Sequence, residues 1–131
     1  MAFKLYSTDD GHVPAWEYYE CSAMTPLCGM AMALNSNGQL VASAQPKYIC
    51  MRQEETPVEA GTKIPVVRIT PDQIWENKLY SDAPAAKVGG FADVDATGKW
   101  ADAKDPENNT MEIVYLTGTT LTDHVRVRFV K

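Results

Sequence analysis

The sequence has little of what catalysis or membrane insertion usually requires. Its 131 residues include only 2 histidines and 3 cysteines. No apolar run approaches the roughly 20 residues of a membrane-spanning helix, and the first ten residues lack the basic-then-apolar order of a signal peptide. We therefore expect a protein made in the cytoplasm, with no membrane partner.

Positive charge is scarce as well. The chain has 12 Lys and Arg against 17 Asp and Glu, a formal net charge of -5, and its basic residues are scattered. Such a chain repels a phosphate backbone. The glycines match no phosphate-binding loop, and Gly89 and Gly90 are expected to mark a β-bulge or a close strand approach. We expect no nucleic-acid partner and no nucleotide cofactor.

The cysteines form no recognised motif. Cys21, Cys28 and Cys50 include no CxxC pair and have no neighbouring histidine, as a structural zinc site would require. In a reducing cytoplasm they are expected to be buried thiols that act as small apolar residues.

The histidines also lack a clear chemical role. Asp123 would point to the opposite face of a strand from His124, which excludes a simple acid–base dyad. His12 with Asp9 and Asp10 could bind a divalent cation, but a solvated turn explains that segment equally well, and no distant ligand can be named. We expect no catalytic residue, no metal and no cofactor, and therefore no enzyme.

The remaining pattern predicts an all-β protein. Short apolar segments alternate with turn residues and contain few helix formers, as in a small β-barrel or β-sandwich. The expected strand segments are 27–34, 39–43, 47–52, 63–69, 73–80, 88–94, 110–116 and 123–130. A single helical turn is possible around 70–76, but a strand is favoured from 73 to 80. We expect one domain from 24 to 131.

Two parts of that domain resemble each other. Aligning the chain with itself, without gaps, superposes five positions: Gly29 on Gly89, Leu34 on Val94, Gly38 on Gly98, Leu40 on Trp100 and Pro46 on Pro106. Both copies indicate strand, tight turn and strand, so we expect two similar hairpins. Asn37-Gly38 favours a type I′ turn, in which both central residues have positive φ.

The two ends of the chain carry the candidate partner-binding residues. Residues 1–23 alternate poorly and are expected to form an extended arm rather than a paired strand. Aromatic residues on such an arm suggest a protein interface. In the last strand, Val125, Val127 and Phe129 alternate with polar residues, so Arg126 and Arg128 form a possible polar interface. The expected arm anchors are Phe3, Leu5, Tyr6, Trp16, Tyr18 and Tyr19.

Four passages resemble the small head decoration, or cement, proteins of tailed bacteriophages, similar in style to the lambda-type proteins. They are MAFKLYSTDDG at 1–11, TPLCGMA at 25–31, IPVVRITPD at 64–72 and VRVRF at 125–129. The resemblance implies a β-tulip-like domain on the outer surface of the expanded capsid, often a homotrimer near threefold positions. Its partner would be the major capsid protein, and it would stabilise the shell against DNA pressure.

Two departures from that family concern the interface. The region 21–32 is rich in Cys and Met, and the loop 104–109 is more polar than expected. One alternative is a small-molecule-binding barrel, in which Ala31, Ala33 and Ala92 could line a pocket. A second alternative is another structural component of the phage virion or tail.

Overall fold

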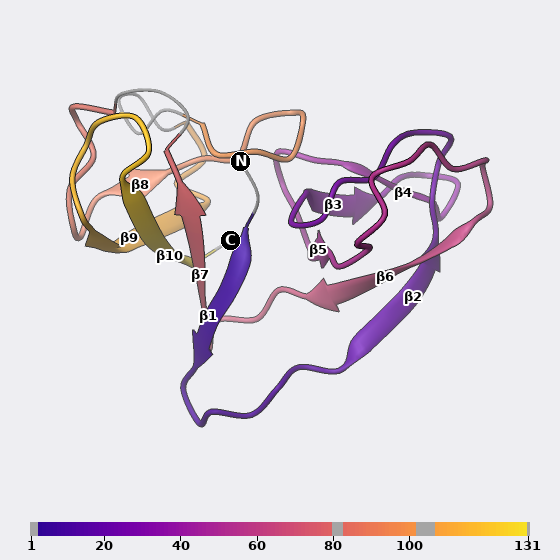
Figure 1. The fold of residues 1–131 in the computed structure, drawn as a ribbon, viewed down its shortest axis with the longest axis horizontal. Coiled ribbons are helices and arrows are strands. Elements are labelled where there is room, and N and C mark those ends of the chain that lie inside the picture. Colours follow the sequence, from indigo (N-terminus) through magenta and orange to yellow (C-terminus); the bar gives the residue numbers. More distant parts are fainter. Residues whose placement is uncertain (1–2, 80–82, 102–106, 131) are drawn as a thin grey trace.

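The protein is built from two antiparallel sheets of five strands each (Figure 1). A computed structural model describes residues 3–79, 83–101 and 107–130, and no helix occurs among them. The strands are β1 (Lys4–Thr8), β2 (Trp16–Glu20), β3 (Ala31–Leu34), β4 (Leu40–Ala42), β5 (Tyr48–Cys50), β6 (Lys63–Arg68), β7 (Gln73–Lys78), β8 (Phe91–Ala92), β9 (Met111–Leu116) and β10 (His124–Phe129).

The first sheet has the strand order β1-β7-β10-β9-β8, and the second has the order β2-β6-β5-β3-β4. Every apolar segment expected to form a strand contains one, which confirms the all-β class. The second sheet curls until one bridge, between Cys21 and Leu40, joins the end of β2 to β4. Among the described residues this bridge does not grow into a ladder, so the sheet is not a closed barrel.

The expectation of an unpaired segment at residues 1–23 is wrong for both strands found there. β1 pairs with β7, and β2 pairs with β6 over all five of its residues. The sequence did not predict β2 as a strand, because its exposed positions include Trp16 and Tyr18, whereas the exposed positions of a strand are expected to be polar. The proposed division of the chain at residue 23 stays a prediction.

The chain contains an internal repeat of strand order, as its alignment with itself predicted. In the first half the order β2-β6-β5-β3 matches β7-β10-β9-β8 in the second half. Leu34 pairs with Leu40 as Val94 pairs with Trp100. Gly29 and Gly89 both have a φ of 85°. The two similar hairpins are therefore confirmed, whereas Pro106 lies outside the described residues.

The two hairpin turns have the same hydrogen bonds but are not of type I′. The Gly38 N–H donates to the Asn35 carbonyl, and the Gly98 N–H donates to the Asp95 carbonyl, each at 3.0 Å. Only the glycine of each turn has positive φ. The loop is one residue longer than a type I′ turn, so a type I turn followed by one left-handed glycine closes it.

Two apolar clusters stabilise the fold. The larger lies between the sheets, where Trp75 and Val127 of the first sheet meet Ile49 and Val67 of the second. The smaller lies on the other face of the second sheet, around Leu40. The last strand alternates as predicted, with Val125, Val127 and Phe129 buried.

Candidate functional site

Two exposed aromatic side chains lie together on β2, at the edge of the second sheet. Trp16 and Tyr18 point to the same face of the strand and are 47% and 59% exposed. Val67, which lies opposite Trp16 on β6, is buried in the cluster between the sheets, and Pro65 lies opposite Tyr18 on the same face. Trp16 and Tyr18 therefore continue that apolar face to the edge of the second sheet, where their side chains stay exposed. Figure 1 shows β2 at the margin of the second sheet. We call Trp16, Tyr18 and Glu20 the β2 edge.

The backbone of the β2 edge faces away from the sheet. The Cys21 N–H donates to the Thr62 carbonyl at 2.7 Å. Since hydrogen-bonded and non-bonded pairs alternate in an antiparallel ladder, Tyr19 and Glu17 also direct their N–H and C=O groups to β6. Trp16 and Tyr18 direct theirs outward, where no strand of the described residues pairs with them. Glu20 lies where the Cys21–Leu40 bridge brings β4 alongside the end of β2.

The equivalent edge in the second half of the chain is covered. The Gly29 N–H donates to the Cys50 carbonyl as the Gly89 N–H donates to the Ile113 carbonyl. Cys50 faces Val66 of β6 and Ile113 faces Val127 of β10, so the preceding residues Pro65 and Arg126 are equivalent. Tyr18 faces Pro65 and Glu76 faces Arg126, so β2 corresponds to β7. On its outward side β7 pairs with β1, where Lys4 lies opposite Glu76. The edge strand of the repeat is thus covered by another strand in the first sheet and uncovered in the second.

The other expected arm residues lie in different surroundings. Phe3 is 2% exposed and contacts Phe129 with ring centroids 5.5 Å apart, and Leu5 packs against the same cluster. Tyr6 is 52% exposed on the outer face of the first sheet. Tyr19 packs against Tyr48, so the six residues do not form one surface.

Tyr19 belongs to a polar network on the far face of β2. Its hydroxyl donates to Glu17 at 2.6 Å, and the Arg68 guanidinium binds the same carboxylate at 2.9 and 3.1 Å. The hydrogen bond to Glu17 raises the pKa of Tyr19 to about 12. These contacts hold β2 on β6, which leaves the Trp16 and Tyr18 side chains free on the opposite face.

Arg126 lies in a second polar network, on the outer face of the first sheet. Its guanidinium carbon is 3.8 Å from the Tyr6 ring centroid and 4.2 Å from that of Tyr115. Its Nε donates to Glu76 at 2.9 Å, and His124 Nδ1 lies 3.4 Å from the same carboxylate. The Arg126 hydrogen bond lowers the pKa of Glu76. Arg126 is therefore already engaged within its own sheet.

Arg128 borders a shallow pocket of about 370 Å³ that lies against Ile69 and Phe129. Its guanidinium donates to the Pro71 carbonyl and, at 3.4 Å, to Asp9. The pocket is not lined by the alanines expected for a ligand-binding barrel. Ala31 and Ala92 are instead fully buried in the cluster between the sheets, where close packing requires small residues.

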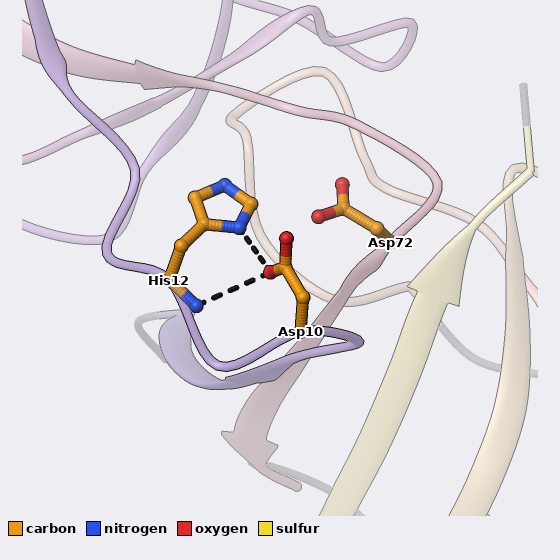
Figure 2. Close-up of side chains that lie close together, drawn as sticks. All are labelled: Asp10, His12 and Asp72. Carbon is orange, nitrogen blue, oxygen red and sulfur yellow. Dashed lines mark hydrogen bonds and ion pairs between the residues drawn. The ribbon is translucent and has the colours of Figure 1, made fainter.

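Asp10 and His12 meet a third potential ligand, Asp72, from the loop between β6 and β7 (Figure 2). One ligand atom from each residue lies within 4.8 Å of the others. His12 Nδ1 hydrogen-bonds to Asp10, which raises the pKa of His12 and lowers that of Asp10. Asp72 accepts a hydrogen bond from Thr70.

The cysteines lie in or beside the smaller apolar cluster. Cys21 and Cys50 are fully buried, as expected, whereas Cys28 is partly exposed. Burial raises the pKa of the Cys50 thiol to about 11 and also raises that of Cys21. A raised pKa disfavours the thiolate, so these two thiols have the character of core residues.

The sequence revealed the aromatic residues of the site but not its geometry. Nothing in residues 16–20 shows which backbone groups face outward, since that depends on pairing with β6, which is distant in the sequence. The proximity of Asp72 to His12 could not be seen either, because it requires the β1–β2 and β6–β7 loops to meet. The internal repeat was the signal that could have located the β2 edge.

Comparisons with models of protein families and with curated proteins give no match to this chain. The described part of the chain contains no helix with the length and apolar character needed to cross a membrane. The functional argument therefore depends on the surface itself.

Proposed function

We propose that this chain is a structural virion protein that binds the outer surface of an expanded bacteriophage capsid and stabilises the shell. The major capsid protein is its proposed partner, and the β2 edge is the proposed contact. A homotrimer near threefold positions, and a β-tulip-like relationship of the curled second sheet, are the finer parts of this proposal.

The observation that carries the proposal is the exposure of Trp16 and Tyr18 beside each other on one strand face. Trp and Tyr are enriched among the residues that dominate binding energy at protein interfaces, because they bury a large area with few rotatable bonds. The strand itself is held rigidly by Glu17, Tyr19 and Arg68. A backbone that is already held in its bound conformation loses less conformational entropy on binding.

Several weak contacts would be sufficient on a capsid. A trimer that engages neighbouring subunits at once gains avidity from effective concentration, without any single tight contact. The net charge of -5 also disfavours binding to the packaged DNA. Both properties suit a protein on the outside of the shell.

The test is co-sedimentation of the purified protein with undecorated shells of the phage that encodes it, comparing expanded shells with compact procapsids. We expect saturable binding to expanded shells alone, because maturation would create the docking site. A Trp16→Ala/Tyr18→Ala double variant should bind at least about a hundredfold more weakly.

The matched control is Val88→Ala, which removes an apolar side chain that is 62% exposed elsewhere on the surface. This variant should bind shells as the unaltered protein does. If the unaltered protein binds neither form of the shell, the capsid function is wrong.

A further inference from the structure

We infer that the β2 edge receives an extended segment of the capsid subunit as an added antiparallel strand, in the register that β1 has on β7. This inference rests on the proposed capsid function and specifies how the partner is bound. It predicts main-chain hydrogen bonds to Trp16 and Tyr18, in addition to contacts with their side chains.

The internal repeat supplies the template for the added strand. In the first sheet, the outward-facing residues of β7 are Ile74 and Glu76, which lie opposite Ser7 and Lys4 of β1. The Asp9 N–H donates to the Asp72 carbonyl at 3.0 Å, which fixes Ser7 and Ile74 as a hydrogen-bonded pair two residues further along.

The same two positions on β2 are Trp16 and Tyr18. Beyond them β2 offers no space for a new strand, because the Cys21–Leu40 bridge places β4 beside the end of β2. An added strand can therefore pair with Trp16 and Tyr18 and would end near Glu20. It would thus pair with two outward-facing residues of β2, as β1 pairs with Ile74 and Glu76 of β7.

The β2 edge also lacks the protection found at the other sheet edges. β8 and β4 are only two and three residues long. β1 carries Lys4 and an irregularity between Leu5 and Ser7. Short strands, lysines and bulges all hinder edge-to-edge pairing. β2 has five residues in regular register, with no lysine or proline, which is the form that an edge takes when another strand covers it.

The side chains of the β2 edge define the chemistry of the incoming segment. Glu20 is exposed and already lies opposite Lys63 of β6, at the end of β2 where the bridge to β4 begins. Beside Trp16 and Tyr18 an apolar or aromatic residue fits best. The partner is thus an extended segment that is apolar or aromatic beside Trp16 and Tyr18, without proline at the paired positions.

Two substitutions at one residue separate backbone pairing from side-chain contact. Tyr18→Pro removes the outward N–H, which the β2–β6 ladder does not use, so this edge position tolerates proline. Tyr18→Val also removes the aromatic ring but retains the N–H and favours a strand. Binding to expanded shells, measured by saturation co-sedimentation, should be at least about tenfold weaker for Tyr18→Pro than for Tyr18→Val.

A second readout uses the unaltered protein and does not depend on how the proline variant folds. On shells, hydrogen exchange of the Trp16 and Tyr18 amides should slow, while the Glu17 and Tyr19 amides, already bonded to β6, should change little. Equal binding by the two Tyr18 variants, together with unchanged exchange at Tyr18, would overturn strand addition and leave the capsid function standing. Absence of binding by the unaltered protein would overturn both.

Discussion

The two halves of this chain share one strand scheme but complete it in different ways. In the second half, residues 74–130, the edge strand β7 is covered by β1. In the first half, residues 16–69, the corresponding β2 is uncovered at Trp16 and Tyr18. The difference shows that β1 completes only one of the two repeats. The unfilled position in the other repeat identifies the β2 edge more specifically than its aromatic composition does.

Equivalent residue pairs of the two halves also differ in burial. Ala31 pairs with Ile49 on an apolar face of the first half that is fully buried between the sheets. The equivalent pair in the second half, Phe91 and Glu112, lies on the outer face, where Phe91 is 37% exposed. The first half therefore has an apolar cluster on each face, and Trp16 and Tyr18 are the large apolar side chains at the exposed edge of its inner face.

The largest expected effect is the contrast between a buried and an exposed tryptophan. Trp75 is fully buried between the sheets, so Trp75→Ala should lower the free energy of unfolding by about 3–5 kcal/mol. Trp16→Ala, at the exposed edge, should change it by less than about 1 kcal/mol. Urea unfolding followed by circular dichroism measures both, and similar losses would show that Trp16 belongs to the core.

The next contrast concerns two equivalent turn glycines. Both have positive φ, which strains any residue with a side chain by about 1–2 kcal/mol. A Cβ at Gly38 meets nothing within 4 Å, whereas one at Gly98 would collide with the backbone of Ala31. Gly98→Ala should therefore cost about 1–3 kcal/mol more than Gly38→Ala. Equal losses in thermal unfolding would show that the 95–98 turn does not pack on β3.

Asp93 provides a pH-dependent contrast, because the equivalent residue in the first half is Ala33. The Asp93 carboxylate accepts N–H groups from Glu107 at 2.6 Å, Asn108 at 3.0 Å and Thr110 at 3.1 Å. Burial acts to raise its pKa, but these hydrogen bonds outweigh burial and lower it. Asp93→Asn should cost roughly 1.5–3 kcal/mol at neutral pH.

The sign of the pH effect follows from the lowered pKa of Asp93. Below the unfolded value of about 3.9 the unfolded chain takes up the proton first, so the stabilisation is present above that pH and is lost as pH falls through the folded pKa. The thermal unfolding midpoint should therefore rise less steeply with pH, between about pH 2 and pH 5, in Asp93→Asn than in the unaltered protein. An unchanged slope would argue against these hydrogen bonds.

The smallest expected effect lies in the exposed turn of the first half. The Asn35 side-chain oxygen accepts N–H groups from Asn37 and Gln39 at 2.9 and 3.0 Å. Asn35→Ala should cost about 1 kcal/mol, and Ser36→Ala, at the exposed neighbouring position, should be nearly neutral. Urea titrations of the two variants measure both losses. Equal free energies of unfolding would show that the hydrogen bonds of the Asn35 side chain do not stabilise the turn.

The sequence predicted most of the strands because their signals are local. Alternation identified β10 through Val125, Val127 and Phe129, and the alignment of the chain with itself identified both hairpins. Turn type was wrong at Asn37-Gly38, since loop length depends on where Leu34 and Leu40 pair. The arm interpretation was wrong for β1 and β2 because their partners, β7 and β6, are distant in sequence. The candidate site followed the same rule: its aromatic residues were evident, but its open edge was not.

Residue-resolved hydrogen exchange of the free protein tests the contrast between β2 and β7 most directly. The Tyr18 amide should exchange rapidly, while those of its neighbours Glu17 and Tyr19 and of the equivalent Glu76 are protected, the last by β1. Protection of Tyr18 equal to that of Glu76 in the monomer would contradict the account, because the β2 edge would then already be occupied.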